Sequence, residues 1–124
     1  MQNAGLAALG LNWRYLAFDV RPEELRETLV GAKAMGFVGL NLTVPHKVLA
    51  VEIVDAVDER AKKYGAVNTV RFEGRTSTGE WVPLALCEET EPLEVRSHGF
   101  NTDAEGFATS LSEFKDLAEL RSNV

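Results

Sequence analysis

Three groups of polar residues in the sequence could act together on a small molecule. They are Asn41, Thr43 and Lys47 in "NLTVPHK", Asn68 and Thr69 in "GAVNTV", and Asn101, Thr102 and Asp103 in "GFNTDAEGF". A lysine can donate a proton to a developing alkoxide, and a neighbouring carboxylate can orient the lysine or tune its pKa. Amides and hydroxyls add hydrogen bonds, so the set suits a polyhydroxylated, anionic small molecule.

Each group also has a purely structural interpretation. Thr102 and Asp103 could cap a helix and complement its dipole. Lys47 in a first helical turn is usually a solvated charge, although a cation there is on the unfavourable side of the helix dipole. Asn41 and Asn68 could satisfy the backbone of a turn. The residue types by themselves leave these alternatives open.

The other reactive side chains give no second site. His46 and His98 have no further His or Cys at a spacing that binds metal, so no metal site is predicted. Cys87 has no basic neighbour in the sequence that would lower its pKa, so it is predicted to be inert. The sequence contains neither a Gly-x-Gly-x-x-Gly pattern nor a P-loop.

Composition limits the class of protein. The 124 residues are enough for one domain with a core, and 45% are hydrophobic. A net charge of -6 argues against binding nucleic acid or an anionic membrane. The single cysteine excludes a disulfide within the chain and favours a reducing cytoplasm. No apolar run is long enough to span a bilayer.

Hydrophobic spacing and turn residues predict alternating helices and strands. Helices are expected over 2–9, 22–36, 45–57, 58–64 and 102–114, and strands over 13–20, 37–43, 66–72 and 93–101. A hairpin or surface excursion is expected over 73–90, with its turn near Ser77 to Gly79. This order indicates an α/β fold with a mainly parallel sheet. Ligands of such sheets bind beyond the carboxyl ends of the strands, where we expect the polar groups to meet.

The three motifs, in this order and at these separations, resemble the substrate-binding domain of shikimate dehydrogenase. The opening residues 1–20 resemble the first helix and following strand of that family, so the similarity covers nearly the whole chain. The resemblance implies a three-layer α-β-α domain over 1–114, with an insertion or hairpin over 76–94. Residues 115–124 resemble the start of a linker to an NADP-binding domain.

The resemblance also implies roles for individual residues. Lys47 matches the family's catalytic lysine, which moves the proton as a ring carbonyl and hydroxyl interconvert. Asp103 matches the aspartate paired with it, which also holds a substrate hydroxyl. Asn41, Thr43 and Asn68 match substrate-binding positions, and Glu59 falls where some members place an acid near the cofactor. We therefore expect Lys47 and Asp103 to be in contact, directly or through one water.

The implied reaction is the NADP-dependent interconversion of 3-dehydroshikimate and shikimate, a step of aromatic amino-acid biosynthesis. The family's first strand, with its Ser-x-Ser loop, does not precede Met1 here, so an open sheet edge is expected near Val38 to Leu42. The glycine-rich NADP domain is not present either, so we expect no turnover from this chain alone. A non-catalytic binding module derived from the family is the alternative. Shikimate or quinate as substrate, NADP or NAD as cofactor, and the oligomeric state stay open.

Overall fold

The computed structural model describes residues 4, 8, 10, 14–87 and 91–103. Their elements, in chain order, are η1 (Pro22–Glu24), α2 (Leu25–Ala34), β1 (Gly39–Asn41), α3 (His46–Ile53), β2 (Ala56–Val57), α4 (Glu59–Tyr64), β3 (Thr69–Arg75), β4 (Trp81–Pro83), η2 (Leu84–Leu86) and β5 (Val95–Phe100). The helices predicted over 2–9 and 102–114 lie almost wholly outside the described residues, as does the predicted linker over 115–124.

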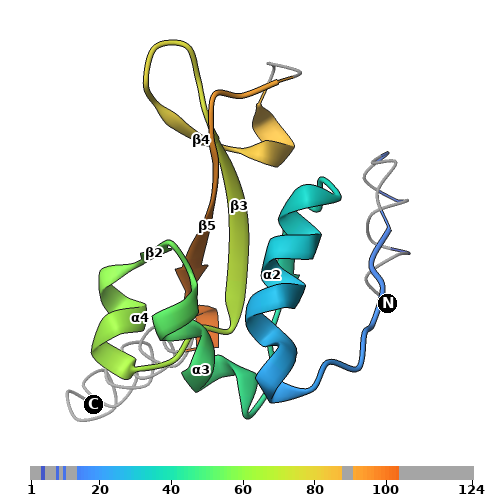
Figure 1. The fold of residues 1–124 in the computed structure, drawn as a ribbon, viewed down its shortest axis with the longest axis vertical. Helices are drawn as coiled ribbons and strands as arrows, with labels where there is room; N and C mark the ends of the chain where they lie inside the picture. The colour runs from blue at the N-terminus through green and yellow to red at the C-terminus, as the bar shows by residue number, and fades with distance from the viewer. Residues whose placement is uncertain (1–3, 5–7, 9, 11–13, 88–90, 104–124) are drawn as a thin grey trace, which may run out of the picture.

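The described strands form one mixed sheet in the order β1-β3-β5-β2, and β4 pairs with β3. Figure 1 labels β3, β4, β5 and β2 of this sheet. β2 pairs with β5 in parallel, whereas β1, β4 and β5 each pair with β3 in antiparallel fashion. Four of these strands therefore run in one direction and β3 runs against them. The predicted α/β fold is confirmed, and the described sheet is mixed. The expectation that it is mainly parallel is wrong for the described strand pairs, because the reversed β3 lies between β1 and β5 and makes three of the four pairs antiparallel. The hairpin is confirmed as well, because β3 and β4 flank a turn in which Gly79 has a φ of 88°.

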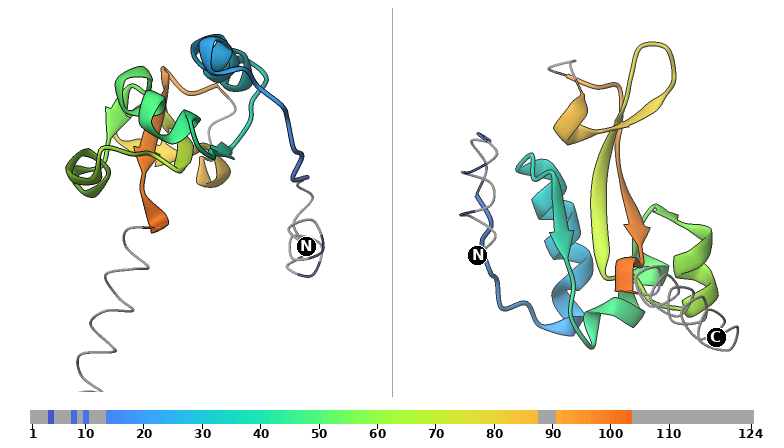
Figure 2. Two further views of the ribbon diagram at one scale, coloured as in Figure 1. Left: turned by 90° about the horizontal axis from the view of Figure 1, so that it is seen from below. Right: turned by 180° about the vertical axis from the view of Figure 1, so that it is seen from behind.

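The hydrophobic core lies between the helices and one face of this sheet (Figure 2). Leu25 and Leu29 form one apolar stripe of α2, and they pack with Ala50 of α3 against Val70 and Phe72 of β3. Because residues 2–9 and most of 102–114 are outside the described part, the third layer of the α-β-α arrangement stays a prediction.

Two predicted elements are wrong in the structure. Residues 14–20 form no strand, although their sequence alternates as a strand would, and Leu16 and Phe18 are exposed. A strand requires backbone pairing, and none of the described strands pairs with this segment. The helix predicted to reach Val57 ends at Ile53, because Val54 has an extended backbone conformation with a ψ of 151°. The chain then enters β2.

The expected open edge near Val38 to Leu42 is confirmed, because β1 is the terminal strand of the described sheet. Val38 O accepts a hydrogen bond from the backbone N–H of Phe72 in β3, and the backbone N–H of Leu42 donates to the oxygen of Asn68, just before β3. In an antiparallel pair the alternate residues face the other way, so the backbone groups of Gly39 and Asn41 point to the edge.

A charged network lies on the face of the sheet opposite the core. The side chain of Glu73 on β3 is only 2% exposed, yet it accepts hydrogen bonds from Arg71 and from Arg96 Nε at 2.8 Å, and lies 3.0 Å from His98 Nδ1. The guanidinium of Arg96 also lies 4.3 Å from the ring centroid of Trp81. Burial opposes ionisation of Glu73, but the bonds from Arg96, Arg71 and His98 outweigh it and lower its pKa.

We predict that Glu73→Gln lowers the free energy of unfolding at pH 7 by about 1–3 kcal/mol, because two arginines lose a buried charged acceptor. A lowered pKa means that the charged form stabilises the fold above the unfolded-state pKa, and that this contribution is lost as pH falls through the folded-state pKa. The difference between variant and unsubstituted protein should therefore shrink in acid. Urea unfolding across pH measures this, with Glu80→Gln on the same hairpin as control. Equal stability at pH 7 would contradict it.

Candidate active site

Lys47 and Asp103 form a direct ion pair although 56 residues separate them. The Lys47 Nζ donates a hydrogen bond to Asp103 Oδ2 at 2.9 Å. The lysine side chain is 26% exposed and the aspartate side chain 68% exposed, so the pair can be reached from solvent. The expected contact between these two residues is confirmed.

The position of Lys47 follows from the start of α3. Pro45 immediately precedes the helix, as its N-cap residue, and places Lys47 in the first turn. A cation in this turn is on the unfavourable side of the helix dipole, and the Asp103 carboxylate supplies the compensating negative charge. The hydrogen bond from Lys47 lowers the pKa of Asp103, with a smaller contribution from Asn68. Asp103 therefore stays ionised over a wider acidic range than an ordinary aspartate.

Asn68 joins the segments that carry the pair. Its backbone N–H donates to Phe100 O at 3.0 Å, and its backbone oxygen accepts from Leu42 N at 2.7 Å. Its side-chain oxygen accepts hydrogen bonds from the backbone N–H of Thr102 at 3.0 Å and from the Thr69 hydroxyl at 3.0 Å. The Asn68 side chain also donates to Thr102 Oγ1 at 2.9 Å. One buried residue thus fixes the ends of β1, β3 and β5 relative to one another.

Asn41, Thr43 and Glu59 are the remaining predicted site residues, and they differ in their contacts. Asn41 ends β1, and Thr69 Oγ1 lies 3.5 Å from its Oδ1. Thr43 is exposed, and its backbone oxygen accepts from the Lys47 backbone N–H at 3.2 Å. Glu59 begins α4, where its side chain is 88% exposed and pairs with Lys62 at 3.2 Å. Among the described hydrogen bonds and ion pairs, none joins Glu59 to the other predicted residues.

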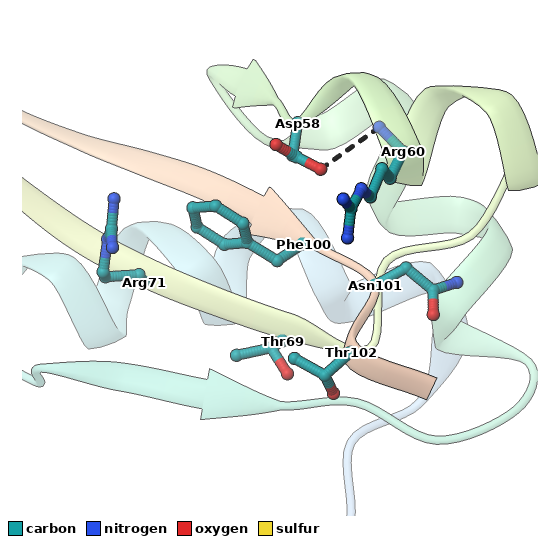
Figure 3. Close-up of a pocket in the computed structure, with 7 residues that line it drawn as sticks. All are labelled: Asp58, Arg60, Thr69, Arg71, Phe100, Asn101 and Thr102. Atoms are coloured by element: carbon teal, nitrogen blue, oxygen red, sulfur yellow. Dashed lines mark hydrogen bonds between the residues drawn. The ribbon is translucent and has the colours of Figure 1, made fainter. Parts of the chain in front are cut away.

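A pocket of about 230 Å³ adjoins the site (Figure 3). Its lining consists of Asp58, Arg60, Thr69, Arg71, Phe100, Asn101 and Thr102. Thr69 and Thr102, both bound to Asn68, connect it to the ion pair, while Arg60 reaches it from the start of α4. Neither Arg60 nor Arg71 belongs to a motif that could be recognised in the sequence. The alternation of Thr69, Arg71 and Glu73 in one strand would have placed Arg71 on the same face as Thr69.

The described part of the chain contains no group of three or more His, Cys, Asp or Glu side chains placed to hold a metal ion. None of its helices has both the length and the apolar character that crossing a membrane requires.

Comparison with known proteins gives the family. Residues 1–70 match the shikimate dehydrogenase substrate binding domain. The chain belongs to this family. It is 45% identical over 113 residues to the shikimate dehydrogenase (NADP(+)) of Methanopyrus kandleri, a match that covers 91% of this chain and 32% of the relative. The chain therefore spans about a third of the length of the curated relatives that it matches.

Solved structures show the same fold. The shikimate 5-dehydrogenase of Thermus thermophilus in complex with shikimate superposes with a TM-score of 0.66 at 34% identity, covering 90% of this chain and 35% of that chain. The 5-ketofructose reductase of Gluconobacter sp. strain CHM43 superposes with a TM-score of 0.63 at 34% identity, covering 90% of this chain and 33% of that one. The predicted likeness to the shikimate dehydrogenase N-terminal domain is confirmed.

We predict that Lys47→Met raises the pKa of Asp103 toward its ordinary value of about 3.9, because the carboxylate loses its charged donor. Titration of the Asp103 carboxyl carbon by NMR measures this directly. Lys62→Met removes an exposed lysine of α4 and serves as the control, with no expected change at Asp103. An Asp103 midpoint that Lys47→Met leaves in place would contradict the ion pair.

Proposed function

We propose that this chain is the substrate-binding and proton-transfer part of an NADP-dependent shikimate dehydrogenase, which interconverts 3-dehydroshikimate and shikimate in aromatic amino-acid biosynthesis. The observation that carries the proposal is the 2.9 Å contact between Lys47 Nζ and Asp103 Oδ2 in a member of this family. The low cysteine content is consistent with a cytoplasmic protein.

In the direction of reduction, the Lys47 ammonium donates its proton to the oxygen of the ring carbonyl as that oxygen gains negative charge. The neutral amine then regains a proton from solvent, which the partly exposed side chain permits. In the direction of oxidation the amine accepts the proton of the substrate hydroxyl. Asp103 orients the amine, stabilises its charged form and accepts a hydrogen bond from a neighbouring substrate hydroxyl. Asn41, Thr43 and Asn68 complete the proposed set of substrate contacts.

NADPH would supply the hydride in the direction of reduction, and NADP+ would accept it in the direction of oxidation. We propose that this dinucleotide binds outside the described residues. The sequence has no glycine-rich phosphate cradle, and the pocket beside the site is only about 230 Å³. We propose that residues 1–114 bind substrate, that 76–94 are an insertion, and that 115–124 lead to a separate NADP-binding domain. Glu59 keeps a proposed place beside the cofactor, and the chain alone should not turn over.

A non-catalytic binding module is the alternative, because the amides and hydroxyls at the strand ends could bind a ligand without any proton transfer. Such a module would bind the same ligand without supporting turnover. Replacing the matching segment of the Methanopyrus kandleri enzyme with this chain separates the two functions, since an inactive chimera that binds shikimate favours the module.

We predict that shikimate binds the isolated chain in calorimetric titration and that Asp103→Asn weakens this binding at least tenfold, since a charged acceptor for a hydroxyl is lost. Asp19→Asn, at an exposed position outside the site, is the matched control.

In the active chimera, Lys47→Ala should lower kcat by about 100-fold or more, the usual cost of losing a positioned acid. A chain that binds no shikimate, or a chimera with unchanged turnover after Lys47→Ala, would refute the assignment. Parallel titrations with quinate and 5-ketofructose would define the substrate class.

A further inference from the structure

We propose that Tyr15 is a positioning residue that holds the Asn41 carboxamide in the orientation in which it meets substrate. The inference rests on the proposed function, because it assigns Asn41 a substrate contact. Its structural basis is the hydrogen bond that Asn41 Nδ2 donates to the Tyr15 hydroxyl at 2.9 Å, across 26 residues of sequence.

Asn41 needs such a partner because its side chain is exposed at the end of an edge strand. An exposed side chain on an edge strand can adopt several rotamers, and ordering it when a ligand binds costs free energy. The contact with the Tyr15 hydroxyl restricts these rotamers in advance, so the Asn41 carboxamide is already in place when a substrate hydroxyl arrives.

The second partner of the Asn41 side chain, the Thr69 hydroxyl, makes the weaker contact. Thr69 has a single hydroxyl hydrogen, and its oxygen lies 3.0 Å from Asn68 Oδ1 but 3.5 Å from Asn41 Oδ1. That hydrogen serves the shorter contact, which also maintains the buried Asn68 network. The Tyr15 hydroxyl is therefore the stronger of these two holds on the Asn41 side chain.

Tyr15 is itself held in place, although residues 14–20 form no strand. The Phe18 ring lies 6.1 Å from the Phe37 ring, between centroids. At the end of the segment, Val20 O lies 2.7 Å from His46 Nε2. His46 directly precedes Lys47 at the start of α3. These two contacts, at Phe18 and at Val20, hold the residues that follow Tyr15 against the region before β1 and against the start of α3.

The test is Tyr15→Phe, which removes the hydroxyl and keeps the ring. Calorimetry should show shikimate binding about three- to tenfold weaker, the usual scale for one hydrogen bond. Without ligand, the side-chain amide signals of Asn41 should shift in the NMR spectrum while the backbone signals of the core stay in place. Tyr64→Phe removes an exposed hydroxyl at the end of α4 and should change neither quantity.

A double-mutant cycle separates positioning from a general effect on the fold. Because Tyr15 acts through Asn41, adding Tyr15→Phe to Asn41→Ala should weaken binding less than about twofold further. Fully additive losses, or a Tyr15→Phe variant with unchanged affinity, would overturn the positioning role and leave the proposed function intact. No binding of shikimate by the unsubstituted chain would instead overturn the proposed function, and this inference with it.

Discussion

The arrangement of the site depends on the hydrogen bonds of one buried residue, Asn68. Its backbone N–H and C=O pair with Phe100 and Leu42, which lie at the ends of two different strands. Its carboxamide binds Thr102, the residue before Asp103. Leaving such groups unpaired in the interior would cost free energy, so these bonds specify one arrangement of the strand ends. The ion pair between Lys47 and Asp103 is possible because the two segments that carry it are held together in this way.

The two faces of the sheet are stabilised by different means. The helices α2 and α3 cover one face, where apolar side chains such as Leu25 of α2 pack in the same core as Phe72 of β3. On the other, Glu73 is buried beneath Arg71 and Arg96, whose guanidinium groups also lie over the rings of Phe100 and Trp81. Charge neutralisation and aromatic contacts there stabilise charged residues at alternate positions of β3. The pocket next to the site begins on this charged face.

The similarity to shikimate dehydrogenases concerns a part of those proteins, which fits what the described residues can do. They provide an amine, a carboxylate, amides and hydroxyls at one edge of a sheet, which are groups that bind hydroxyls and move a proton. The 5-ketofructose reductase has the same fold at a similar level of identity. The fold itself therefore does not select the substrate, and selection must come from side chains around the site.

The sequence by itself determined the α/β class, the helices that begin near Pro22 and Pro45, the hairpin with Gly79 and the family, because these depend on local spacing and on motifs. It also indicated Lys47 and Asp103, through the resemblance. It did not reveal that residues 14–20 lack a paired strand, since pairing requires a neighbour that alternation cannot show. Nor did it reveal the reversed direction of β3, which brings the start of that strand, with Asn68 and Thr69, to the carboxyl ends of β1 and β5. Only the tertiary structure decided this, because hydrogen bonds between segments far apart in the chain set strand direction.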